Sequence, residues 1–239
     1  MKKAFLIALL FFVSASTTVF SQSYIRTMEY LRGRSFVEGD YTRTAGFEPS
    51  LVVAFDFQKD SGHGITMGYK LAPDQHAFNL AYRFALFNAG KGWFYVENRY
   101  LYRLFPAYSL QEFNGMLSFG YHNTHWNFKL GLCNRYIAEV PLRLDGGMGT
   151  IFEPLNVVFD MNYHLFGEEH SWNIGLGISN QREFIIERVT LFYYTLDGYY
   201  NINNKWRLLG EAGLHPAGVL NLSSQYNGYF INLGFTYYY

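Results

Sequence analysis

The chain has 239 residues, carries 19 basic and 19 acidic side chains, and contains 20% aromatic residues. A neutral chain without basic runs has no electrostatic footprint for nucleic acid, so we expect no nucleic-acid partner. Its single cysteine, Cys133, excludes a disulfide framework within the chain. After the N-terminal segment, no apolar run approaches the roughly 18 residues of a membrane-spanning helix, which excludes a helical membrane protein.

Residues 1–21 have the pattern of a cleavable secretory signal peptide. Lys2 and Lys3 form a basic start, and the apolar run over residues 4–13 is too short to cross a membrane as a helix. We expect cleavage after Ser21. This leaves residues 22–239, which contain no linker or low-complexity segment, as a single domain.

From residue 47 onward, apolar and polar side chains alternate, which is typical of strands with one apolar and one polar face. Eleven strands are predicted: 47–57, 64–71, both arms of a hairpin over 76–104, both arms of a hairpin over 113–136, 151–163, 171–179, 188–200, 206–214 and 229–239. The strand over residues 188–200 is aromatic on both faces. Which of its side chains face outward therefore stays open.

The hairpin over residues 76–104 has the clearest register. If its turn is centred on Gly90, Leu86 lies opposite Phe94 on the apolar face. On the polar face the same register places Arg83 opposite Glu97, and a cross-strand pair of opposite charge helps to fix strand register.

The next hairpin repeats this arrangement. Pairing Tyr121 with Trp126 across the turn places Glu112 opposite Arg135, again on the polar face. We therefore predict a second cross-strand ion pair here.

The last strand has the most regular alternation and is predicted to close a barrel. One face carries Tyr229, Ile231, Leu233, Phe235, Tyr237 and Tyr239. A strand of this length can cross a hydrocarbon core of ~30 Å when it is tilted. Aromatic residues at the ends of an aliphatic face suit the two interfaces of a membrane.

An even strand number is expected for a single-chain bacterial barrel, so a twelfth strand should precede residue 40. The candidate is residues 24–37, although Arg32 and Arg34 share a face with Tyr30 and Phe36. If the last strand runs inward, the tight turns near residues 89, 123, 167 and 202 are periplasmic, and the longer links near 40, 143, 183 and 221 lie outside. The predicted fold is all-β, a transmembrane antiparallel up-and-down barrel of twelve strands. Ten strands, with the N-terminal stretch as a periplasmic arm or short helix, is the alternative.

The signal peptide and the closing strand, which ends in Tyr237-Tyr238-Tyr239, resemble those of bacterial outer-membrane β-barrel proteins. In that family a terminal aromatic residue on an alternating strand resembles the signal that the barrel-assembly machinery reads. The resemblance implies an outer-membrane location, with membrane lipid and the barrel-assembly machinery as partners. It points to no narrower subfamily and leaves the oligomeric state open.

The polar face of the predicted strands is rich in charge. Its candidate pore-lining residues are Asp56, Lys70, Arg83, Glu97, Arg99, Arg103, Glu112, Lys129, Arg135, Asp160, Arg207 and Glu211. They form either a water-filled constriction that selects solutes or an ion-pair lattice that fills a narrow lumen. Charges inside a low-dielectric wall must be paired or hydrated, and the two predicted ion pairs favour the lattice, which could still line a small pore. Seven basic against five acidic residues hints at anionic solutes.

Metal binding and cofactors are not expected. His122 and His125 have a spacing compatible with a metal, and His63, His164 and His170 are predicted near the same rim. A zinc site usually needs three or four converging ligands, so we interpret these side chains as hydrated turn histidines.

No catalytic residue is assigned. A lipid hydrolase or acyltransferase would need a serine with a histidine and an acid, and His215, Ser223, Ser224 and Glu211 are the nearest candidates. Such residues are common in loops, and Cys133 is interpreted as a small filler of the inner face. The sequence thus predicts a small passive pore or a structural barrel. A lipid-modifying enzyme and a surface-binding barrel are the alternatives.

Overall fold

The computed structural model describes residues 21–31, 35–38, 41–43, 47–58, 63–72, 75–106, 109–140, 150–166, 170–186, 192–216 and 226–238. In chain order the strands are β1 (Ser21–Leu31), β2 (Ser35–Glu38), β3 (Tyr41–Arg43), β4 (Phe47–Gln58), β5 (Gly64–Leu71), β6 (His76–Ala89), β7 (Gly92–Phe105), β8 (Leu110–His122), β9 (Trp126–Glu139), β10 (Ile151–His164), β11 (Trp172–Ser179), β12 (Gln181–Arg182), β13 (Ile185–Ile186), β14 (Tyr193–Asn201), β15 (Trp206–Pro216) and β16 (Tyr226–Tyr238). The predicted signal peptide lies, apart from Ser21, outside the described residues.

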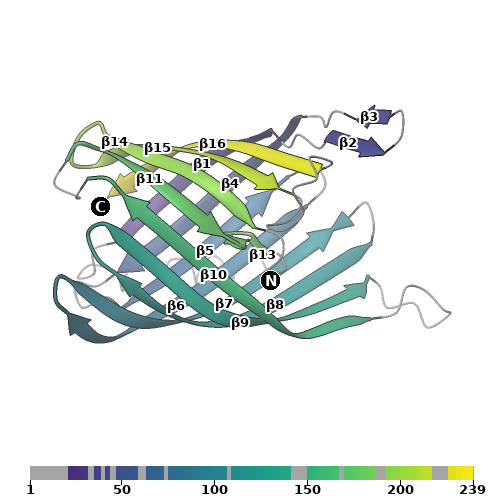
Figure 1. Cartoon of the computed structure of the whole chain (residues 1–239), viewed down its shortest axis with the longest axis horizontal. Helices are drawn as coiled ribbons and strands as arrows, with labels where there is room; N and C mark the ends of the chain where they lie inside the picture. Colours follow the sequence, from purple (N-terminus) through teal and green to yellow (C-terminus); the bar gives the residue numbers. More distant parts are fainter. Residues whose placement is uncertain are drawn as a thin grey trace, which may run out of the picture.

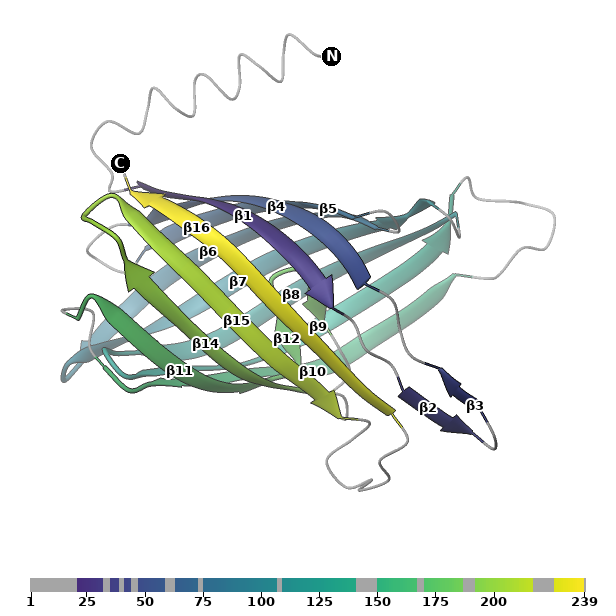
Figure 2. The same ribbon diagram turned by 90° about the horizontal axis from the view of Figure 1, so that it is seen from above.

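Twelve of these strands form one closed antiparallel barrel (Figures 1 and 2). Their order is β1-β4-β5-β6-β7-β8-β9-β10-β11-β14-β15-β16, so each strand lies beside its neighbour in the sequence. The last strand also pairs with the first, with Phe235 opposite Ile25 and Tyr237 opposite Ser23. The predicted all-β, up-and-down barrel with the C-terminal strand as its closing element is confirmed, as is the count of twelve within the described residues.

The first barrel strand differs from the prediction of residues 24–37. Strand β1 begins at Ser21 and pairs with β4 along its whole length, so it is a wall strand and not a periplasmic arm. The stretch around Arg32 and Arg34, where the alternation fails, lies outside the described residues. Beyond it, β2 and β3 form a hairpin that pairs with the start of β16 and lies at the end of the barrel opposite the C-terminus (Figure 2).

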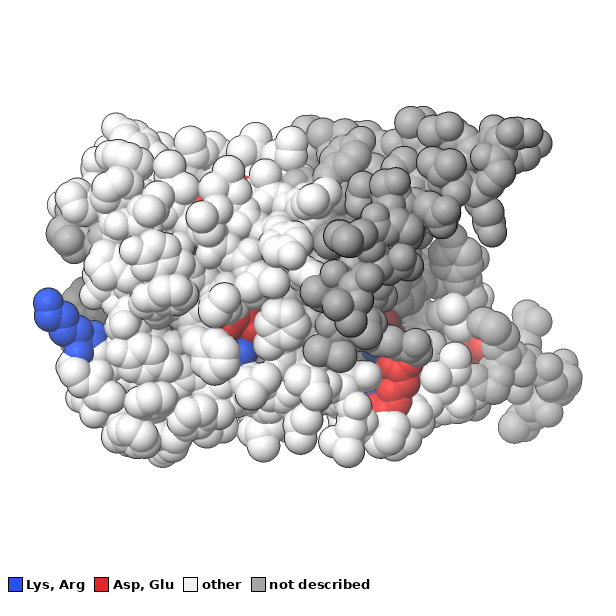
Figure 3. Space-filling view, in the orientation of Figure 1, with Lys and Arg blue, Asp and Glu red and all other residues white. Residues whose placement is uncertain are grey.

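Alternation along each strand gives the wall two different faces. In β9, Leu130 and Leu132 are 49% and 50% exposed, whereas Lys129 and Cys133 are buried. Large aliphatic and aromatic side chains are exposed in the same way on β4 to β11 and on β14 to β16, where side chains are described, and charged groups are sparse on the face drawn in Figure 3. Monomeric soluble proteins rarely expose apolar patches of this extent, and an outward apolar band is what a lipid-facing barrel requires.

No helix of membrane-spanning length and hydropathy occurs in the part of the chain that the structure describes.

The predicted register of the hairpin over residues 76–104 is right in its central part. Arg83 lies opposite Glu97, as predicted. Near the turn a bulge in β6 shifts the pairing, so that Phe87 rather than Leu86 lies opposite Phe94. The connection is a tight turn in which Gly90 has a φ of 61°, a conformation that glycine adopts readily.

The predicted register of the next hairpin is wrong by two residues. Tyr121 lies opposite Phe128, so Arg135 lies opposite Asn114 instead of Glu112. The reason is local. Asn123 accepts hydrogen bonds from the backbone N–H groups of residues 125 and 126 through its side-chain oxygen, at 2.8 and 2.7 Å, and this tight asparagine turn sets the pairing.

Gly120, on the inner face of β8, provides a test of interior packing. It lies opposite Tyr95, which is fully buried, and a Cβ at position 120 would overlap the Tyr95 ring. We expect Gly120→Ala to lower the free energy of unfolding by about 1–3 kcal/mol, because overpacking forces a buried ring to move. The measurement is urea unfolding of the folded protein in lipid vesicles, followed by tryptophan fluorescence.

Gly210→Ala is the matched control, because the nearest atom to a Cβ there is the Leu233 Cδ2 at 3.9 Å, an ordinary contact. Equal stability of the two variants would contradict the close packing of Tyr95 on β8.

Candidate functional site

The inner face of β6, β7 and β9 carries an ion-pair cluster centred on Glu97. Glu97 is 2% exposed, and its carboxylate lies 3.1 Å from the Arg83 Nη2, 3.0 Å from the Arg99 Nη2 and 2.9 Å from the Lys129 Nζ. Lys129 is itself buried and reaches Glu97 across the intervening strand β8. One buried carboxylate thus holds three cations, which is how a low-dielectric interior can contain charge.

A second cluster lies on the same wall around Glu112. The Glu112 carboxylate is 3.1 Å from the Arg103 Nη1 and 3.2 Å from the Arg135 Nε, and it accepts a hydrogen bond of 2.8 Å from the Asn114 side chain. Arg135 also approaches Glu153 of β10 at 3.5 Å. The predicted pair between Glu112 and Arg135 therefore exists, but as a diagonal contact and not as a directly opposed pair.

The link near residue 183, which was predicted to lie outside, folds into the barrel instead. Strand β11 ends at Ser179, and beyond it the side chain of Asn180 makes the next hydrogen bonds to the backbone of β10. Its oxygen accepts from the Phe159 N–H at 2.7 Å, and its Nδ2 donates to the Val157 carbonyl at 2.8 Å. The chain then turns inward as the short hairpin β12–β13, which lies within the ring of wall strands (Figures 1 and 2).

Two apolar side chains of this hairpin pack against apolar residues of the inner face. Phe184 is 4% exposed and Ile186 is 1% exposed. They form one buried cluster with Val52, Ala77, Leu101, Met116, Cys133 and Val158, which come from β4 and from β6 to β10. A Cβ on Gly68 of β5 would lie only 2.9 Å from the Phe184 Cζ, so this glycine makes room for the ring.

Two polar contacts anchor the hairpin to the wall. The Arg182 Nη2 lies 3.0 Å from the Glu211 Oε2 of β15, and Arg182 is 8% exposed. On the opposite side, the Arg135 Nη2 donates a hydrogen bond to the Ile186 carbonyl. The hairpin therefore bridges the interior from the wall of β15 to the wall of β9.

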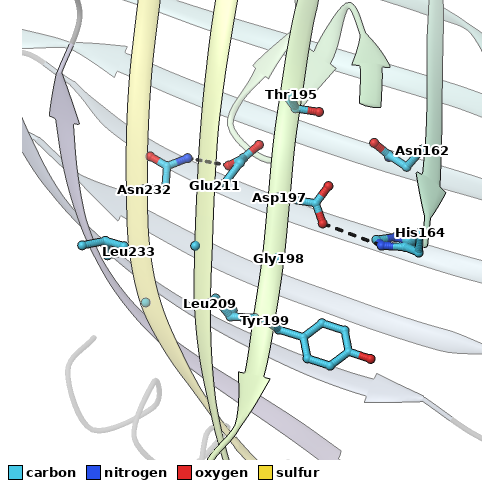
Figure 4. Close-up of a pocket in the computed structure, with 12 residues that line it drawn as sticks. Asn162, His164, Thr195, Asp197, Gly198, Tyr199, Leu209, Glu211, Asn232 and Leu233 are labelled. Atoms are coloured by element: carbon cyan, nitrogen blue, oxygen red, sulfur yellow. Dashed lines mark hydrogen bonds and ion pairs between the residues drawn. The ribbon is translucent and has the colours of Figure 1, made fainter. Parts of the chain in front are cut away.

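Beside the hairpin lies a polar cavity of about 270 Å³ (Figure 4). Its lining consists of Asn162, His164, Thr195, Asp197, Gly198, Tyr199, Leu209, Gly210, Glu211, Asn232, Leu233 and Gly234, from β10 and β14 to β16. The His164 Nδ1 is 3.8 Å from the Asp197 Oδ2, and Asn232 donates to Glu211. His164 and Asp197 approach each other across β11 because Gly175, which lies between them, has no side chain. The cavity thus presents two carboxylates, amides and hydroxyls.

The remaining predicted inner-face residues border these groups, and Asp160 lies opposite Lys129 of the Glu97 cluster. Lys70 is buried on β5, and Asp56 is half-buried on β4. Asp160 accepts a hydrogen bond of 2.9 Å from Asn162. Arg207 donates to Asn201 and lies over the ring of Tyr199, with 3.9 Å from the Arg207 Cζ to the ring centroid.

Among the described side chains, sequence reasoning missed four charged groups of the interior: Glu153, Arg182, Glu183 and Asp197. Adding them to the predicted seven basic and five acidic residues gives eight of each sign, since one is basic and three are acidic. The predicted basic excess, on which the expectation of anionic solutes depended, is therefore gone from this described set. Glu97 and Glu112 hold five of the cations on the wall of β6 to β9, whereas Asp197 and Glu211 lie at the cavity.

On the closing strand, Ile231, Leu233 and Phe235 are 44%, 60% and 43% exposed on the outer face. Tyr237 is half-buried, and the side chains of Tyr229 and Tyr239 lie outside the described residues.

Of the residues considered for catalysis, Glu211 lies at the cavity and pairs with Arg182. Ser223, Ser224 and the side chain of His215 lie outside the described residues. Among the described side chains, no group of three or more His, Cys, Asp or Glu is arranged to hold a metal ion. His125 lies close to β10, with its Nδ1 3.0 Å from the His164 carbonyl oxygen.

Comparison with solved structures identifies the fold. No family model and no curated protein matches the chain. The KdgM porin, in a complex with disordered oligogalacturonate, aligns with a TM-score of 0.50 at 12% identity over 91% of this chain and 98% of the porin. The NanC porin aligns with a TM-score of 0.50 at 10% identity over 89% and 98%. An active-site mutant of outer membrane phospholipase A from Escherichia coli aligns at 0.47, with 12% identity over 92% of each chain.

At these identities the comparisons address the fold and not the activity. Together with the closed twelve-stranded sheet and its apolar outer face, they show that the chain has the fold of the bacterial outer-membrane β-barrel proteins.

Proposed function

We propose that the protein is a narrow passive pore of the outer membrane, through which small hydrated solutes pass along the cavity side of the interior. The observation that carries this proposal is the uneven filling of the lumen. The wall of β6 to β9 is occupied by interlocked ion pairs around Glu97 and Glu112. The wall of β10 and β14 to β16 leaves a polar cavity of about 270 Å³. Polar side chains around free volume support water and small solutes, whereas a purely structural barrel would need its interior filled on all sides.

The charge at the cavity favours cations and neutral polar solutes over anions. Asp197 and Glu211 face the same space, whereas each of the five basic side chains in the two clusters of the opposite wall contacts a carboxylate. A passage lined by one sign of charge between low-dielectric walls raises the local concentration of the opposite ion. We therefore expect a mild preference for potassium over chloride.

Conductance in planar bilayers tests this function. The purified protein should give small resolved steps, and a potassium chloride gradient should give a reversal potential of the sign of a cation-preferring pore. Asp197→Asn should shift that potential toward zero. Asn162→Asp, a matched change in the same lining, should shift it the other way. Silent bilayers would contradict the pore, and a reversal potential of the anion-preferring sign would contradict the assigned path.

A further inference from the structure

We propose that the hairpin β12–β13 is a plug that gates this pore, and that the ion pair between Arg182 and Glu211 is the latch that keeps it closed. This inference rests on the proposed pore function. It adds the regulation of the lumen: the seated hairpin blocks the continuation of the path that begins at the cavity, and the path opens when the hairpin leaves its place.

The seat of the plug is shaped for it. Phe184 reaches across the interior to β5, where Gly68 leaves space for its ring, and the neighbouring inner-face positions Val52 and Ala77 are also small. The wall beside Gly68 carries the small residue Ala54 on β4 and the buried Asn79 on β6, and the buried Lys70 lies between Val52 and Ala77. The space at Gly68 therefore admits the Phe184 ring, while polar groups border it.

The plug can leave without damage to the barrel wall. Within the described ranges, strands β12 and β13 pair only with each other, in a two-stranded sheet with two residue pairs, and such a short hairpin has little stability of its own. The two wall strands on either side of it already pair with each other, with Ser179 opposite Tyr193. The hairpin is therefore an insertion between β11 and β14, which already pair with each other without it. Withdrawal of residues 181–186 breaks the contacts of Arg182, Phe184 and Ile186 with the wall, and among the described residues it breaks no backbone pairing between wall strands.

The latch joins the plug to the lining of the proposed path. Glu211 contributes to the cavity, and its Oε2 lies 3.0 Å from the Arg182 Nη2. Arg182 is 8% exposed, and Glu211 is 28% exposed, so the pair is only partly shielded from water. Its attraction is strong enough to favour the seated state and weak enough to be broken reversibly.

The chain contains a natural reporter for this movement. Cys133, its single cysteine, is 1% exposed and belongs to the apolar cluster that Phe184 and Ile186 cover. When the hairpin is withdrawn, the Cys133 thiol faces the lumen. Its reaction with a charged, membrane-impermeant methanethiosulfonate reagent therefore measures how often the plug is out.

The test uses the full-length protein in lipid vesicles. Arg182→Glu, which places two carboxylates together, should speed labelling of Cys133 by about tenfold, the effect of losing one partly buried ion pair. Arg182→Glu with Glu211→Arg restores opposite charges and should return the rate to near that of the wild type. Phe184→Gly, which removes the tip from its seat without changing charge, should also speed labelling. Arg207→Glu is the matched control, because Arg207 binds Asn201 and no residue of the hairpin among the described contacts.

Bilayer recordings of the same proteins separate the gate from the pore. Wild-type protein should show steps with long closed intervals, and Arg182→Glu should stay open for most of the record. Unchanged labelling in both Arg182→Glu and Phe184→Gly would overturn the plug while leaving the pore intact. Fast labelling with silent bilayers for every variant would instead overturn the pore, and with it the gating role. Migration of unheated samples on gels shows that each variant has folded.

Discussion

Glu97→Gln is expected to lower the free energy of unfolding by about 3–5 kcal/mol, a large fraction of the stability of a single domain. The carboxylate is 2% exposed and is the shared partner of Arg83, Arg99 and Lys129. The glutamine fits the same space but leaves three cations without their anion. The most affected is Lys129, which is 3% exposed and cannot turn toward bulk water. Urea unfolding in lipid vesicles measures the change.

Two further variants show whether the loss comes from unpaired charge. The double variant Glu97→Gln with Lys129→Met removes the anion together with the most buried cation, so it should recover part of the lost stability. Glu153→Gln is a control on the neighbouring strand. Glu153 is 18% exposed, and its 3.5 Å contact with Arg135 is longer, so we expect a loss of about 1 kcal/mol.

The outcome also decides between two interpretations of this wall. If Glu97→Gln proved as stable as the wild type, lumen water would have to hydrate the three cations. The wall of β6 to β9 would then belong to a wide aqueous channel. A large loss supports an interlocked lattice on this side, with the solute path confined to the other.

The barrel was predictable from the sequence because the two faces of its wall lie in different environments. A strand with lipid on one side and a polar interior on the other must alternate strictly, and Leu130, Leu132 and Lys129 obey this rule. The same alternation assigned Arg83 and Glu97 to one face, and the regular part of the ladder then made them neighbours. Twelve strands followed from the even number that such barrels use.

Register was predictable only where the ladder is regular. In β10 the pairing shifts between Glu153 and Asn156, and the shift turns Glu153 inward although its place in the alternation suggested the outer face. Pro154 is the available signal, because a proline lacks the N–H that a ladder needs and is tolerated at bulges. The bulge that displaced Leu86 in β6 has no comparable signal, since it depends on how the tight turn is closed.

The plug and the cavity could not be assigned from periodicity. Residues 180–186 belong to a link between two strands, and Phe184, Ile185 and Ile186 form an apolar run that is unusual for an external loop. That apolar run was the available signal that the link is buried. Where the run packs depends, however, on small residues such as Gly68 on the far side of the barrel, which the run itself does not indicate. Asp197 was missed because its strand is aromatic on both faces, so the sequence left the inward set open.

The placement of the outer face in lipid gives the last prediction. Leu132 is 50% exposed at the middle of β9, between Trp126 and Tyr136, which are also exposed near the two ends of the strand. Leu132→Arg would put a cation near the centre of the hydrocarbon layer. We expect the substitution to destabilise the folded protein in the membrane by about 2–4 kcal/mol. The amount of assembled protein in outer-membrane fractions should therefore fall.

Depth is the variable that separates this effect from simple loss of a leucine. Leu165, which is 48% exposed in the turn that follows β10, should tolerate arginine with a change of about 0–1 kcal/mol, because the end of a strand lies at the membrane interface. A soluble barrel would treat the two arginines alike, since water hydrates both. Equal tolerance, with the protein recovered in the soluble fraction, would therefore remove lipid from the explanation of the apolar outer face, and without lipid there is no membrane for a pore to cross.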